Sequence, residues 1–356
     1  MPPRRSSRVA VAADHAGVAL WPLPPALALR VFALLPVDVR LRCREVSRGW
    51  RDALDERSLW THLDLRVEGV RLAAPYAKLQ TAWGLLLRSA SARAGGGLET
   101  LDASDNRLIQ HAEVLHAFAS NAGTLRRVQL CTSAASDLAP LLLAAPQLQV
   151  LGLDWLSCLR VADALPVLRN VPPYGPLRVR TLSITGRQSD HAFLALASSI
   201  AAHETLQELD FSFHEAGLGL AVLDALVNAA VARRLRSFTL RSFHLRANAV
   251  PALARLVGGG ALEKLSIGNS RRLLDLPSAT LLGAALRAST HITTIRLDRV
   301  GLWSSAQVGV ALVDALVGHP SLTCLSSPSR PAQGAPSPGW APAQARTASV
   351  YTHFQL

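Results

Sequence analysis

A short apolar pattern returns along most of this 356-residue chain and constrains its fold more than any other feature. The pattern is an aliphatic residue, two variable residues, a second aliphatic residue, one variable residue and a third, as in Leu148, Leu151 and Leu153. Its nine copies lie 23 to 31 residues apart, and they start at Leu98, Leu125, Leu148, Val179, Leu206, Leu235, Leu262, Ile292 and Leu322. The ninth copy keeps only its first two apolar residues, Leu322 and Leu325. A repeat of this length predicts a stack in which each unit buries its apolar face only against its neighbours.

The segments between the copies are rich in Ala and Leu, which predicts helices. We expect them over residues 110–121, 136–145, 190–203, 219–232, 249–257, 278–289 and 305–318, with Asp190, Ser278 and Ser305 as helix caps. Residues 156–178 are Pro-rich and predict an irregular connection. The pattern resembles leucine-rich repeats of the ribonuclease-inhibitor type, and the first copy keeps an asparagine at Asn106. The resemblance implies an α/β solenoid with parallel strands on the concave face and helices on the convex face.

Polar residues alternate with the apolar ones inside each predicted strand. Because side chains alternate between the two faces of a strand, these polar residues should line the concave face. Long concave surfaces of solenoids usually bind protein partners, although a merely solvated face is the competing interpretation. The predicted target-binding residues are Thr100, Asp102, Arg127, Gln129, Asp154, Glu208, Asp210, Arg241, Lys264, Arg296 and Asp298.

The segment from Leu23 to Trp60 predicts three short helices that precede the repeats. Leu27 and Val31 belong to a first apolar stripe that ends at Pro36, and two further stripes follow. Below about 40 residues a chain rarely folds without help. These helices carry more large apolar side chains than they can bury among themselves, which indicates a docking module.

The order of residues in this segment resembles the F-box. The matching elements are a Leu-Pro opening, an aliphatic-Phe pair, a Leu-Pro-x-Asp turn, then Val, Trp and a closing Leu-Trp. Ala26 departs from the family pattern, which usually has an acidic residue there. The resemblance implies docking on a Skp-type adaptor and, through it, on cullin. The implied adaptor-binding residues are Leu23, Pro24, Val31, Phe32, Leu35, Val39, Val46, Trp50, Leu59 and Trp60, which would also form the small core of the module.

Together these patterns predict five segments. They are a flexible arm over 1–20, an F-box-like module of three helices over 21–66, a helical linker or cap over 67–97, a solenoid of about nine leucine-rich repeats over 98–325 and an unfolded Pro/Ser/Ala-rich tail over 326–356.

No catalytic, metal or cofactor site is predicted. The glycine clusters at 95–97 and 258–260 precede strands, whereas a phosphate-binding loop follows one. His111, Glu113 and His116 lack the spacing that places two imidazoles on one helix face, and no cysteine is near. We therefore expect a protein that binds and is not itself an enzyme.

The net charge of +12 raises the question of nucleic acid. A nucleic-acid groove would gather basic and aromatic residues on one face, whereas the predicted concave set mixes both signs and has no aromatic residue. The arginines of the first module, Arg40, Arg42, Arg44, Arg48 and Arg51, would instead suit an acidic protein partner. Nucleic-acid binding is thus not favoured.

No apolar run is long enough to span a membrane, and the four widely spaced cysteines suit free thiols in a reducing compartment. We expect a cytoplasmic or nuclear location. The resulting hypothesis is a substrate-recognition subunit of an SCF-type ubiquitin ligase that holds an unknown protein target. The alternative is a leucine-rich-repeat scaffold outside that machinery, in which the N-terminal helices are only a cap.

Overall fold

The structure is a computed structural model that describes residues 24–66, 76–104, 106–131, 138–154, 179–185, 190–212, 218–241, 244–270, 273–302 and 305–326. The predicted N-terminal arm, the irregular 156–178 connection and the C-terminal tail after Ser326 lie outside these ranges, as does Leu23. Among the described residues no helix is both long and apolar enough to cross a membrane.

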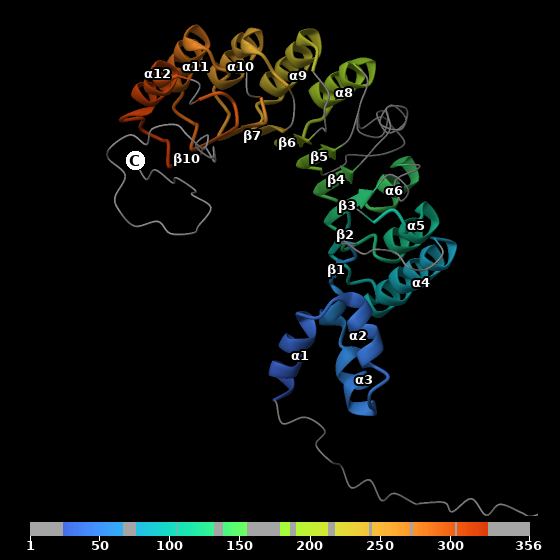
Figure 1. Cartoon of the computed structure of the whole chain (residues 1–356). Coiled ribbons are helices and arrows are strands. Elements are labelled where there is room, and N and C mark those ends of the chain that lie inside the picture. The colour runs from blue at the N-terminus through green and yellow to red at the C-terminus, as the bar shows by residue number, and fades with distance from the viewer. Residues whose placement is uncertain are drawn as a thin grey trace, which may run out of the picture.

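In the described part of the chain, ten parallel strands form one sheet in which every strand pairs with its neighbours in chain order. The strands are β1 (His62–Asp64), β2 (Thr100–Ala103), β3 (Arg127–Cys131), β4 (Val150–Asp154), β5 (Thr181–Thr185), β6 (Glu208–Ser212), β7 (Ser237–Arg241), β8 (Lys264–Gly268), β9 (Thr294–Asp298) and β10 (Cys324–Ser326). The sheet curves into an arc with its strands on the inner side (Figure 1). The predicted α/β solenoid is confirmed.

Helices cover the outer side of the arc (Figure 1). They are α4 (Tyr76–Ala94), α5 (His111–Ser120), α6 (Leu138–Ala144), α8 (Asp190–Ala202), α9 (Leu220–Arg233), α10 (Val250–Gly258), α11 (Leu276–Ala288) and α12 (Ala306–Leu316). Ser305 caps α12 as predicted, because its hydroxyl accepts from the Val308 N–H. The prediction of Ser278 as a cap was wrong. The Asp275 carboxylate accepts from the Ser278 N–H, so the cap lies three residues earlier than expected and α11 begins at Leu276.

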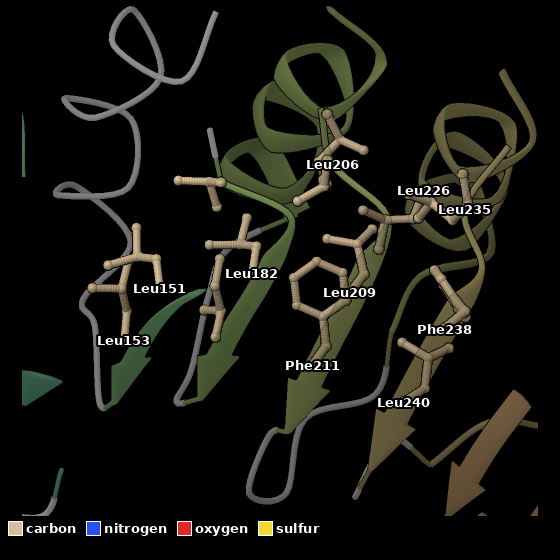
Figure 2. Close-up of a cluster of buried hydrophobic side chains, with 14 of the residues drawn as sticks. Leu151, Leu153, Leu182, Leu206, Leu209, Phe211, Leu226, Leu235, Phe238 and Leu240 are labelled. Carbon is tan, nitrogen blue, oxygen red and sulfur yellow. The ribbon is translucent and has the colours of Figure 1, made fainter. Parts of the chain in front are cut away.

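The core lies between the sheet and the helices. Apolar side chains of the strands point toward the helices and stack from one repeat to the next, as Leu182, Leu209 and Phe238 do in Figure 2. The registers pair these positions directly, with Leu182 opposite Leu209 and Leu209 opposite Phe238. Each buried Leu or Phe side chain contributes about 1.5–3 kcal/mol relative to an exposed one. The repeat is therefore the unit of stability, and its interior is continuous along the stack.

One hydrogen-bond arrangement recurs at the entrance of each strand. The carbonyl of the residue before a strand accepts from two successive amides of the next repeat. The Glu263 carbonyl accepts from the Thr293 and Thr294 N–H groups at 2.8 and 3.0 Å. The Thr293 carbonyl accepts in turn from Thr323 and Cys324 at 2.9 and 3.1 Å. This ladder fixes the register of one repeat on the next.

The sheet begins earlier than the sequence pattern predicted, with β1 in front of the first expected strand. Trp60, Leu63 and Leu65 occupy the three apolar positions of the repeat there, and all three are buried. Leu63 pairs with Leu101 of β2. The buried side chain of Asn106 joins the two units, because its amide donates to the Leu65 carbonyl at 2.6 Å. The end of the N-terminal helical module is thus the first unit of the solenoid.

Candidate protein-interaction surfaces

The N-terminal module consists of α1 (Pro25–Ala33), α2 (Val37–Cys43), α3 (Arg48–Leu54) and the short 3-10 helix η1 (Arg57–Trp60). Prolines at the start of α1 and before α2 suit first-turn positions, where the missing N–H has no intrahelical partner. In Figure 1 the three α-helices project from the end of the arc, beyond α4.

A small core holds these helices together. The rings of Phe32 and Trp50 meet edge to face with centroids 5.3 Å apart. The buried Trp60 indole donates to the Leu54 carbonyl at 2.7 Å. The guanidinium of Arg93 on α4 lies 5.7 Å from the Trp60 ring centroid. Trp60 therefore belongs to the module core and to its junction with the solenoid.

The predicted adaptor-binding set divides by burial. Phe32, Leu59 and Trp60 are buried, so their assignment as contact residues is corrected to core residues of the module. Leu35, Val39 and Trp50 are half-buried, while Pro24, Val31 and Val46 are exposed. Leu23 lies outside the described residues.

An apolar face of α1 lies open to solvent. Leu27, Val31 and Leu34 follow each other at helical spacing, and Leu34 is 85% exposed. Val46, just after α2, is 64% exposed. The predicted set omitted Leu27 and Leu34, although the spacing of 27, 31 and 34 along one helix face could have identified them. Exposed large apolar side chains gathered on one module indicate an interaction site.

Of the five arginines predicted to suit an acidic partner, Arg40 is buried, so its assignment to that surface is corrected, while the prediction for the other four is untested. Arg40 is buried and donates to the carbonyls of Ala33, Leu35 and Leu59. Arg42 pairs with Asp38, and Arg44 pairs with Asp55 at 2.7 Å. Arg48 and Arg51 are exposed, and the Arg51 guanidinium donates to the Arg44 carbonyl at 3.4 Å.

The predicted target-binding residues all lie on strands, at positions that alternate with the buried ones. The basic residues Arg127, Arg241, Lys264 and Arg296 are exposed. The others of the set are half-buried, except Asp154, whose side chain is not described. The structure thus places them on the concave face without testing whether they bind a target.

Charges on this face are partly neutralised in place. The Arg241 guanidinium lies 3.5 Å from the Asp210 carboxylate, and Arg296 lies 2.9 Å from Asp298. Burial raises the pKa of the Asp210 carboxyl, and the positive charge of Arg241 opposes that rise. No described acidic group pairs with Lys264. A partner here would meet mixed charges and no exposed aromatic platform.

A hollow of about 540 Å³ opens at the end of the concave face nearest the helical module. Strands β1 to β3 line it, together with Arg40. Among its polar groups, the His62 imidazole contacts the Thr100 hydroxyl at 2.9 Å, and Asp64 forms a two-point ion pair with Arg66. That hydrogen bonding lowers the pKa of Asp64. The lining of the hollow mixes charged and polar side chains with the apolar residues Leu63 and Leu101.

No described group of three His, Cys, Asp or Glu side chains is placed to hold a metal ion. Glu113 contacts Arg88 of α4 at 3.4 Å. Cys43, Cys131 and Cys324 are free thiols.

Comparison with known proteins agrees with this arrangement. Residues 20–66 match the F-box-like family. The chain is 26% identical to human F-box/LRR-repeat protein 12 over 317 residues, which cover 83% of this chain and 92% of the relative. The chain thus resembles F-box proteins that carry leucine-rich repeats. The F-box-like segment comprises the projecting helices, and the repeats form the arc.

Further relatives are similar at comparable levels. The bovine F-box/LRR-repeat protein 12 is 25% identical over 304 residues, with 78% of this chain and 88% of the relative covered. Among solved structures, a leucine-rich repeat-containing protein, LegL7 from Legionella pneumophila, aligns with a TM-score of 0.48 and 18% identity, covering 75% of this chain and 83% of that one.

Proposed function

We propose that this chain is the substrate-recognition subunit of an SCF-type ubiquitin ligase. In this proposal the F-box docks on a Skp-type adaptor, which connects it to cullin, and the concave face of the repeats binds a protein target. The bond chemistry belongs to other subunits, and the chain acts without a catalytic site by raising the effective concentration of its target.

The open apolar face of α1 carries this proposal. A helix that served only to cap the solenoid would bury its apolar face against the repeats. Here the F-box core is complete without Leu27, Val31 and Leu34, and these side chains still face solvent. The sheet is already started by β1, so α1 is not needed to finish the stack. A partner whose surface covers α1 explains both features.

The decisive experiment is co-purification of the full chain with a Skp-type adaptor. Leu34→Asp is the informative variant, because this side chain is exposed and its loss leaves the F-box core intact. Burial of one Leu side chain contributes about 1.5–3 kcal/mol, which corresponds to roughly tenfold to hundredfold in affinity. We expect at least that weakening, since the variant also places a charge in the contact.

Leu85→Asp is the matched control. Leu85 is 61% exposed on α4, so the same substitution is made at an exposed apolar position outside the F-box. We expect the wild type and the Leu85 variant to retain the adaptor and the Leu34 variant to lose it. If the wild type retains no adaptor, or both variants retain it equally, the scaffold alternative is favoured.

The target side of the proposal needs a separate measurement. Proximity labelling by the full chain, with and without a proteasome inhibitor, should enrich proteins that accumulate only when degradation is blocked. The charge-reversal variant Lys264→Glu should change that set, because Lys264 is exposed on the concave face and lacks an acidic partner there. The proposal also places the chain in the cytoplasm or nucleus, which imaging of the tagged chain tests.

A further inference from the structure

The last helix of the described solenoid exposes a row of valines. Val310 and Val313 of α12 are 57 and 38% exposed, and Val317, which caps its C-terminal end, is 66% exposed. In α11, thirty residues earlier in the chain, the residue equivalent to Val313 is Gly283. A Cβ on Gly283 would lie 2.7 Å from the Cβ of Ala315, so this position faces the next helix. Val313 therefore faces the place where a further unit would pack.

The last described strand, β10, also has an unpaired edge on the side where a further unit would pack. In nine successive strand pairs, the carbonyl of the residue before one strand accepts two amides from the next repeat. The equivalent carbonyl beyond the ninth pair is that of Thr323. Among the described residues nothing donates to it, and β10 pairs only with β9. Both layers of the solenoid thus end with an uncovered face.

The last six residues of the chain repeat the apolar pattern once more. Tyr351, Phe354 and Leu356 have its spacing, and Tyr351 follows Leu322 by 29 residues, within the 23 to 31 of the earlier copies. An aromatic residue at the first position has a precedent in Trp60, which begins the first unit and is fully buried. The copy lies in the same chain as two uncovered surfaces that a further repeat would cover, the valine row of α12 and the free edge of β10.

Thr352 supports the alignment of this terminal copy with the earlier ones. Thr293 and Thr323 each occupy the position after the first apolar residue of a copy. Their hydroxyls donate to the carbonyls of Glu263 and Thr293, at 3.1 and 3.0 Å. Thr352 occupies that position in the terminal segment, directly after Tyr351. Its hydroxyl and amide would have the Thr323 carbonyl as their acceptor.

We propose that residues 351–356 pair in parallel with β10 as a further strand, so that the chain closes its own solenoid. His353 then lies opposite Cys324, and Phe354 lies opposite Leu325. The connection is long enough, because 26 residues separate Ser326 from His353 and 25 separate Asp298 from Cys324.

A disulfide tests the register. Neighbouring strands lie about 4.8 Å apart, which is within the Cα separation that a disulfide spans. The full chain with Cys43, Cys131 and Cys158 replaced by Ala keeps Cys324 as its only cysteine. His353→Cys in this background should form an intramolecular disulfide with Cys324 under mild oxidation, identified by peptide mass spectrometry.

Thr352→Cys is the matched control, because the neighbouring side chain points to the other face of a strand. We expect at least a tenfold lower yield of the link from residue 352 than from residue 353. Phe354→Asp added to the His353 variant should abolish the preference, since it removes the central buried side chain. If the background that keeps only Cys324 does not fold, the same comparison is made with all native cysteines present and read by peptide mapping.

Equal yields from positions 352 and 353 would overturn the proposal, because a free tail has no register. A disulfide between two chains, seen as a covalent dimer, would also overturn it and show that a second copy covers this end. The proposal does not depend on adaptor docking, so either result leaves the proposed function unchanged.

Discussion

Arg40 makes the F-box a cooperative unit, and its replacement provides the sharpest test of how this module is built. Its side chain is only 8% exposed and reaches carbonyls from three places. It donates to Leu35 and Ala33 at 2.8 Å each, at the end of α1, and to Leu59 in η1. No described carboxylate pairs with it, and burial lowers its pKa. The backbone alone balances the buried charge.

Arg40→Met is the perturbation, because it keeps an unbranched apolar stem and removes every donor. The bond to the Leu59 carbonyl is buried, and an unsatisfied buried acceptor costs about 1–3 kcal/mol. The other two bonds are partly exposed, so water replaces the donor and each loss costs about 1 kcal/mol. The sum is about 3–5 kcal/mol, a large fraction of the stability of a small domain.

Hydrogen exchange of the full-length variant shows which part of the molecule loses this stability. Amides of the F-box helices should exchange at least a hundredfold faster, whereas those of β5 to β9 should be unchanged, because distant repeats in a stack are coupled only through their neighbours. Arg42→Met is the control, since Arg42 forms an exposed pair with Asp38 worth about 0–1 kcal/mol. Equal effects of the two variants would refute the role given to Arg40.

Three further predictions concern the repeats. Gly283→Ala should destabilise the chain by about 1–3 kcal/mol despite its better helix propensity, and adding Ala315→Gly should restore stability in a double-mutant cycle. Asn106→Ala should lower the denaturant midpoint, at about 1–3 kcal/mol for each buried backbone group left unsatisfied. Burial is the main cause that lowers the pKa of His203, and the positive charge of Arg233 adds to it. The imidazole of His203 therefore binds a proton more readily in the unfolded chain than in the folded one. Stability should therefore fall as pH drops from about 7.5 through 6.5, and His203→Gln should flatten this slope in urea titrations.

The solenoid could be predicted because its determinants are local and repeated. Eight of the nine copies carry all three apolar residues, the last two of them on one face of a strand, and the copies recur every 23 to 31 residues. The helices between them were predicted to within a few residues. β1 was missed for a physical reason as well. Its unit begins with Trp60, and Leu98 follows Trp60 by 38 residues, a spacing outside the period of the others.

The surfaces could be predicted only in part, because burial is a property of the folded arrangement. An arginine in a sequence is normally a surface residue, and only the folded module brings three carbonyls to Arg40. The same applies to Phe32 and Trp60, which a family pattern places in the F-box without telling core from contact. Leu34 is the converse case. Its position at the end of α1 leaves it 85% exposed although its neighbours are partly covered.

The junction between F-box and repeats bears directly on how such a receptor would work. β1 continues the sheet, and Arg93 of α4 lies over the Trp60 ring of η1, so the two parts are joined by a shared core and not by a tether. A flexible tether would let a bound target sample many distances from the adaptor. A continuous sheet restricts those distances, and the effective concentration of the target then depends on which repeat holds it. The hollow over β1 to β3 lies at the F-box end of the concave face, so a target bound there and one bound over β8 and β9 would be presented differently. In the proposed ligase, the position of a target along the arc would therefore select which of its lysines are modified.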